Sequence, residues 1–174
     1  MLDSNEYINE SIIEGHGYPI SFINLKILDK KSENSMCKVK GLMFDNTDGV
    51  YKESKGSGFF FKQNISKINY YNKYFLITNN HLIDSDFLNN YDKLTIIYKN
   101  KEKEIPLNDN RIIYTNTTLD YTIIQIFENE FNKEEIKYFF TIDNYIMNNN
   151  YKNKDIYIVQ YPNGKELCFA HGEI

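Results

Sequence analysis

A histidine and an aspartate each lie beside an apolar, strand-like run of this chain. His81 directly follows the apolar residues of YFLITNNHLI, and Asp120 lies within the later run LDYTIIQI. An imidazole can take a proton from a hydroxyl nucleophile when a buried carboxylate holds its tautomer and stabilises its charged form. In such an arrangement His81 would be the general base and Asp120 the carboxylate that orients it.

The nucleophile that such a pair would activate is missing from the expected part of the sequence. The last serine of the chain is Ser85, well before Asp120. Thr122 is a β-branched strand residue, Thr141 lies in a connecting segment, and Cys168 lies in a hairpin, so none has the setting of an activated nucleophile. We expect these 174 residues alone to hydrolyse no peptide bonds.

The apolar runs around these residues predict an all-β body. From Met36 onward, short runs rich in Ile, Phe, Tyr, Val and Thr alternate with polar, Asn-rich joints, which is typical of consecutive strands rather than βαβ units. Six strands would suffice to close a small barrel. We predict them over residues 36–44, 58–62, 74–79, 93–99, 103–114 and 121–127.

The residues before and after this body have a different character. In the N-terminal extension, residues 1–34, Pro19 could lie in a first helical turn, and Ile20, Ile23 and Ile27 recur near helical spacing, which predicts a short helix. The polar segment 129–152 predicts a connector that could hold another short helix. Residues 153–174 predict two further strands around a Pro-Asn-Gly turn.

Five motifs follow one another along the chain: GSGFFF, LITNNHLI, LDYTIIQI, YIVQYPNG and AHGEI. In this order they resemble the trypsin-like (chymotrypsin/trypsin-type) serine peptidases, over roughly residues 36–174. The resemblance implies a Greek-key β-barrel over residues 35–128 and the start of a second barrel over residues 153–174. It also implies that His81 is the general base and Asp120 the orienting carboxylate.

The same resemblance gives structural roles to five further residues. Gly56 and Gly58 match the glycines of the strand before the histidine, where a missing Cβ lets the backbone approach a neighbour closely or bend at a barrel corner. Pro162 and Gly164 match the turn that opens the second barrel. Gly172 matches a glycine that precedes the next strand's apolar residue.

Two departures from the family pattern limit what the resemblance implies. Leu82 stands where secreted members usually carry a disulfide-bonded cysteine, which fits a reducing compartment. The GxSGxP box, which supplies the nucleophile and the N–H groups that bind the oxyanion, would be expected shortly beyond Ile174. The chain would then hold only the base and the carboxylate of a triad.

Two hypotheses follow for the function. The first is the N-terminal portion of a trypsin-like serine endopeptidase, whose partner would be a peptide or protein substrate once the missing region completes the cleft. The alternative is a non-enzymatic, peptidase-like relic that acts as a protein-binding module. Self-association through the incomplete second barrel would suit this second hypothesis, because an unfinished barrel exposes unpaired strand edges.

Charge and hydropathy argue against other classes of function. The net charge of -4 and the single arginine, Arg111, provide no basic surface for nucleic acid. No apolar run approaches the roughly 18 residues of a membrane helix, and the acidic N-terminus shows no signal peptide. We therefore expect a cytoplasmic protein without nucleic-acid or membrane partners.

The cysteines and histidines show no pattern of a metal site. Cys37 and Cys168 are too few for a disulfide framework and are expected to be free, buried thiols. Together with His16, His81 and His171 they form no CxxC or HxxxH spacing. We expect no metal and no other cofactor.

Overall fold

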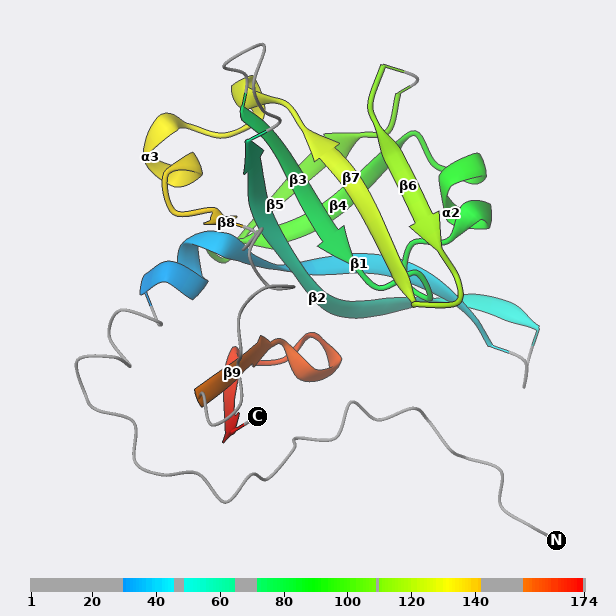
Figure 1. Ribbon diagram of the computed structural model, residues 1–174. Helices are drawn as coiled ribbons and strands as arrows, with labels where there is room; N and C mark the ends of the chain where they lie inside the picture. The colour runs from blue at the N-terminus through cyan, green and yellow to red at the C-terminus, as the bar shows by residue number, and fades with distance from the viewer. Residues whose placement is uncertain (1–29, 46–48, 65–71, 109, 142–154, 174) are drawn as a thin grey trace, which may run out of the picture.

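The computed structural model describes residues 30–45, 49–64, 72–108, 110–141 and 155–173, most of them in antiparallel β-strands (Figure 1). The strands are β1 (Met36–Asp45), β2 (Val50–Asn64), β3 (Asn72–Thr78), β4 (Lys93–Tyr98), β5 (Lys101–Pro106), β6 (Ile113–Asn116), β7 (Tyr121–Ile126), β8 (Phe140–Thr141), β9 (Asp155–Gln160) and β10 (Cys168–Glu173). Short helical segments are residues 30–35, α2 (Ser85–Asn90), η1 (Glu128–Glu130), α3 (Lys133–Ile136) and η2 (Pro162–Gly164). The predicted all-β class is confirmed.

Most predicted strands are present, but the expected continuous run over residues 103–114 is wrong. The chain ends β5 at Pro106 and resumes as β6 at Ile113. Between them, the backbone N–H of Arg111 donates to the carbonyl of Asn108 at 3.0 Å, which closes a turn. Asparagine favours such turns because its side chain competes with strand hydrogen bonding.

The predicted helices and turn can be compared only where the structure describes them. Residues 30–35 are helical, whereas Pro19 lies outside the described residues. The polar connector contains η1 and α3, and the Pro-Asn-Gly turn is present as η2. None of the helices in the described ranges is long and apolar enough to cross a membrane.

Seven strands form one curled sheet in the order β5-β4-β1-β2-β3-β7-β6, and β8 adds a parallel pairing to β2 (Figure 1). The long strand β2 pairs antiparallel with β1 over its first part and with β3 over its last part. At the two ends of this order lie β5 and β6, which are consecutive along the chain. Strands β9 and β10 form a separate antiparallel pair.

The core lies on the concave side of the curled sheet. Strands β4 and β7 alternate between buried and half-buried residues, so that Leu94, Ile96, Ile124 and Ile126 point inward. The ring of Phe60 on β2 is fully buried, and its centroid lies 4.9 Å from those of both Phe131 and Phe139. The segment after β7, which contains η1 and α3, therefore closes the core with aromatic side chains.

Both cysteines are free, but they differ in exposure. Cys37 on β1 is fully buried, and burial raises the pKa of its thiol far above the ordinary value. Cys168, at the start of β10, is partly exposed, so its predicted burial is wrong. Cys168 lies in the two-stranded sheet β9–β10, whereas Cys37 belongs to the core cluster of the large sheet.

Candidate catalytic pair

His81 lies in a turn that follows β3 and leads into α2. The backbone N–H groups of Leu82 and Ile83 both donate to the carbonyl of Asn79 at 3.3 Å. Asp84 then caps α2, because its carboxylate accepts the N–H of Phe87 at 2.7 Å. Between these two features the side chain of His81 remains 45% exposed. The imidazole of His81 therefore lies on a short, hydrogen-bonded turn and faces solvent.

Asp120 is the last residue of the connection between β6 and β7. It lies just before the first residue of β7, at the edge of the strand predicted over residues 121–127. Its φ is +49°, a left-handed conformation that aspartate adopts more readily than most residues. The turn is supported by the N–H of Leu119, which donates to Oδ1 of Asn116 at 2.9 Å.

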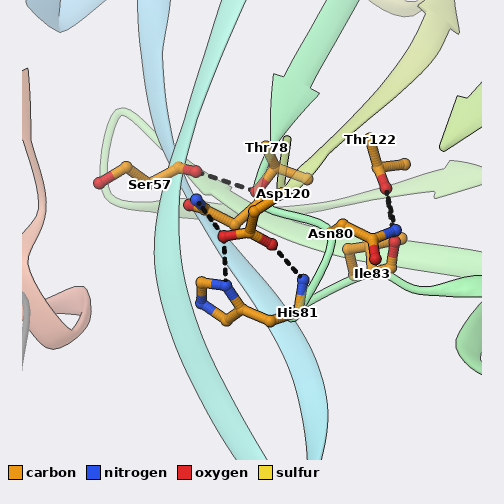
Figure 2. A network of polar contacts seen from close by, with 8 residues as sticks. Ser57, Thr78, Asn80, His81, Ile83, Asp120 and Thr122 are labelled. Carbon is orange, nitrogen blue, oxygen red and sulfur yellow. Dashed lines mark hydrogen bonds and ion pairs between the residues drawn. The ribbon is translucent and has the colours of Figure 1, made fainter. Parts of the chain in front are cut away.

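The structure brings His81 and Asp120 together through two contacts (Figure 2). Nδ1 of the imidazole lies 2.7 Å from Oδ2 of Asp120, and the backbone N–H of His81 donates to Oδ1 at 2.8 Å. Because an ionised carboxylate only accepts, the first contact favours the tautomer with the proton on Nδ1. Nε2 is then unprotonated and can accept a proton from another molecule.

A third donor reaches the same carboxylate from the residue that begins the turn. Nδ2 of Asn79 donates to Oδ2 of Asp120 at 3.1 Å. Burial by itself raises the pKa of the Asp120 carboxyl, but the hydrogen bonds from the backbone and ring of His81 and from Asn79 outweigh it, so the pKa is lowered. Asp120 is therefore an anion at neutral pH and can stabilise a charged imidazole.

A buried polar chain fastens the histidine turn to β7 (Figure 2). The hydroxyl of Thr122 accepts from Nδ2 of Asn80 at 3.2 Å and donates to the carbonyl of Ile83 at 2.7 Å. Thr122 is fully buried, so its hydroxyl is committed to holding the turn. This arrangement agrees with the prediction that Thr122 is a poor nucleophile.

Glycines in β1 and β2 make room for the residue that follows the histidine. A Cβ added to Gly41 would lie 2.3 Å from the carbonyl oxygen of Leu82, and one added to Gly56 would lie 2.3 Å from its Cδ1. A Cβ added to Gly58 would lie 2.6 Å from Cγ2 of Val39 and 2.9 Å from Cδ1 of Leu76. The close approach predicted for the glycines of the GSGFFF motif is therefore present, and it seats Leu82 in the core beneath His81.

Ser57, within the GSGFFF motif, lies close to this site but its hydroxyl has another partner. Its Oγ accepts the backbone N–H of Tyr161 at 2.8 Å, while its carbonyl accepts the hydroxyl of Thr78 at 2.9 Å. In Figure 2 the Ser57 hydroxyl points away from the imidazole of His81. Within the described part of the chain, no hydroxyl or thiol forms a hydrogen bond with the ring of His81.

The remaining predicted residues lie elsewhere. Pro162 and Gly164 form η2, where Gly164 has a φ of +65° and a Cβ on it would lie 2.3 Å from Cβ of Lys55 on β2. Gly172 pairs with Ile156 in the small sheet. His16 and the side chain of His171 lie outside the described residues. In the described ranges, no group of three or more His, Cys, Asp or Glu side chains is arranged to hold a metal ion.

Two asparagines of this site were not identified from the sequence. Asn79 and Asn80 follow β3 directly, in a position where a run of apolar residues ends. Each points its amide at a residue of the β7 region, Asn79 at Asp120 and Asn80 at Thr122. The sequence signal that could have identified them is the pair of adjacent asparagines directly before His81.

Comparisons with known proteins found no matching family model, no matching curated protein and no matching solved structure.

Proposed function

We propose that His81 and Asp120 are the general base and orienting carboxylate of a trypsin-like serine endopeptidase. The observation that carries this proposal is the double contact between the two residues, in which one carboxylate accepts both the main-chain N–H and Nδ1 of the same histidine. A carboxylate held in this way fixes the ring, its tautomer and the direction of Nε2. An ion pair that served only the fold would not require this orientation.

The course of the strands supports the proposed fold. Strand β4 returns to pair with β1, and β7 pairs with β3, so the antiparallel order departs from a simple meander in the manner of a Greek key. Strands β5 and β6 lie at the two ends of this order and are consecutive along the chain. We propose that these two strands meet to close a trypsin-like barrel.

In the proposed reaction, Nε2 of His81 removes the proton of a serine hydroxyl as the serine oxygen forms a bond to the peptide carbonyl carbon. The resulting imidazolium is stabilised by Asp120 and returns the proton to the amine as the peptide C–N bond breaks. A water molecule then releases the acyl group by the same sequence of proton transfers. The serine and the oxyanion donors would be supplied from outside these 174 residues.

The direct test is to sequence the gene and its transcript across the codon for Ile174. The proposal expects an in-frame or frameshifted stretch that encodes a GxSG box. The longer polypeptide should then hydrolyse peptides, and replacement of His81 or of the new serine by alanine should abolish that activity. An unrelated downstream sequence, or a longer polypeptide whose activity survives His81→Ala, would overturn the proposal.

A second candidate function is a protein-binding module without catalysis. Among the described strands, β9 and β10 pair only with each other, and Ile158 on β9 is 41% exposed. Unpaired edges are templates for β-strand addition by a second chain. Analytical ultracentrifugation of the 174-residue chain tests this function, because a concentration-dependent dimer that is lost with Ile158→Lys would support it over the enzyme.

A further inference from the structure

The side-chain amide of Asn79 and the imidazole of His81 both contact the same oxygen of Asp120, Oδ2. Nδ2 of Asn79 lies 3.1 Å from Oδ2, and Nδ1 of His81 lies 2.7 Å from the same atom. The main chain of Asn79 is itself fixed, because its carbonyl accepts the N–H groups of Leu82 and Ile83. The amide is thus presented to the carboxylate from a residue that the turn already holds in place.

A carboxylate on a single Cβ–Cγ bond can rotate unless both of its oxygens are held. The backbone N–H of His81 holds Oδ1, but Oδ2 would otherwise be held only by the ring that it is meant to orient. Asn79 supplies a donor to Oδ2 that is independent of the ring. The direction of the carboxylate is therefore set before the imidazole is engaged.

We propose that Asn79 is a positioning residue, whose amide fixes the Asp120 carboxylate so that Oδ2 faces Nδ1 of His81. The inference rests on the proposed function, because its purpose is to hold the base in the Nδ1–H tautomer. Asn79 and His81 come from one turn, so the orientation of Asp120 needs only the part of the cleft that this chain contains. Groups that hydrogen-bond the partner of a functional histidine commonly fix the orientation and tautomer of its ring in this way.

The test uses the full 174-residue chain labelled with ¹⁵N-histidine, with the resonances of His81 identified by their absence in His81→Ala. The ¹⁵N chemical shifts of the ring report which nitrogen carries the proton. In the wild-type chain the Nδ1–H tautomer should predominate at a pH where the ring is neutral. Asn79→Ala should lower the ratio of Nδ1–H to Nε2–H about tenfold, the effect expected for the loss of one hydrogen bond to a charged group.

Asn79→Asp keeps the shape of the side chain but replaces the donor with an acceptor. It should lower the ratio at least as much as Asn79→Ala does, which a role in packing alone would not produce. The matched control is Asn90→Ala, which removes an asparagine amide that donates to the carbonyl of Asp86 in α2, away from the site. This control should leave the tautomer ratio of His81 unchanged.

Asp120→Asn separates a failure of this inference from a failure of the proposed function. With Oδ1 kept on the backbone N–H of His81, the new amide would face Nδ1 and should force the proton to Nε2. If this variant changes the ratio while both Asn79 variants keep the wild-type value, only the role of Asn79 is overturned. If Asp120→Asn also leaves the ratio unchanged, the pair does not form and the proposed function fails with it.

Discussion

Gly41 lies so close to the main chain of Leu82 that a Cβ on Gly41 would be 2.3 Å from the Leu82 carbonyl oxygen. This contact places β1 directly against the residue that follows His81. The candidate base is therefore positioned from two directions. Gly41 in β1 allows the turn that contains His81 to pack closely against the sheet. The contacts of Asn79 and Asn80 hold the same turn to the start of β7.

Replacement of Gly41 by alanine should be more harmful than the same replacement at Gly56. At Gly41 the new methyl group meets a backbone carbonyl, whereas at Gly56 it meets Cδ1 of Leu82, which can change rotamer. We expect Gly41→Ala to lower the free energy of unfolding by about 1 to 3 kcal/mol and Gly56→Ala by less. Urea denaturation measures both, and equal losses would contradict the backbone contact.

Asp120 should make the stability of the protein depend on pH in the acid range. Its pKa is lower in the folded chain than its ordinary value, which is about 3.9 in model peptides. Such a group contributes stability at pH values above its unfolded pKa, and the contribution is lost as the pH falls through its folded pKa. The carboxylate is partly exposed, so solvent screening keeps this contribution small.

The measurement is the difference in free energy of unfolding between the wild-type chain and Asp120→Asn. This difference should stay constant above about pH 5 and shrink as the pH falls below about pH 4. Urea denaturation at a series of pH values provides it. A difference that is the same at pH 7 and at pH 3 would show that Asp120 gains no stabilisation from its three donors.

The 174-residue chain should not hydrolyse peptides. Removal of the nucleophile from a serine peptidase lowers kcat by about a factor of a million, and the residual rate depends on an intact oxyanion hole. The hydroxyls of Ser57 and Thr122 have other partners, so neither replaces that nucleophile. A fluorogenic peptide library should give the same background with the wild-type chain and with His81→Ala. Turnover that disappears in His81→Ala would contradict this expectation.

The strands could be predicted from sequence because their side chains alternate against one core. In β4 and β7, inward Leu and Ile residues alternate with less buried ones, and this pattern gives the element and its face together. The break between β5 and β6 could not be predicted in this way, because the apolar residues continue on both sides of it. A turn hydrogen bond between Asn108 and Arg111 decides it.

The two residues of the candidate site could be predicted from the sequence, but the contacts that orient their side chains could not. The pairing of His81 with Asp120 was predicted from the order of the motifs around them, together with the place of each residue beside a strand end. The left-handed φ of Asp120 and the amide contacts of Asn79 and Asn80 depend on how β7 lies beside β3. Contacts between residues far apart in sequence produce no periodic pattern of apolar residues along the chain. They can therefore be recognised only in the folded structure.

The chain's single arginine forms an almost fully buried ion pair that supports the segment after β7. Nη2 of Arg111 lies 2.5 Å from Oε1 of Glu130 and Nη1 lies 3.0 Å from Oε2, with the two side chains 1% and 14% exposed. Oε2 also accepts the backbone N–H of Phe127 at 2.7 Å. Arg111 thus joins the β5–β6 turn to η1, next to the aromatic side chains that close the core.

Glu130→Gln should lower the free energy of unfolding by about 3 to 5 kcal/mol, because it leaves the buried guanidinium without its counter-charge. The control is Glu104→Gln, which breaks the pair between Lys93 and Glu104, whose side chains are 52% and 58% exposed. An exposed pair of this kind contributes about 1 kcal/mol or less. Urea denaturation compares the two variants, and a loss for Glu130→Gln no greater than that for Glu104→Gln would mean that the buried pair does not hold this segment to the sheet.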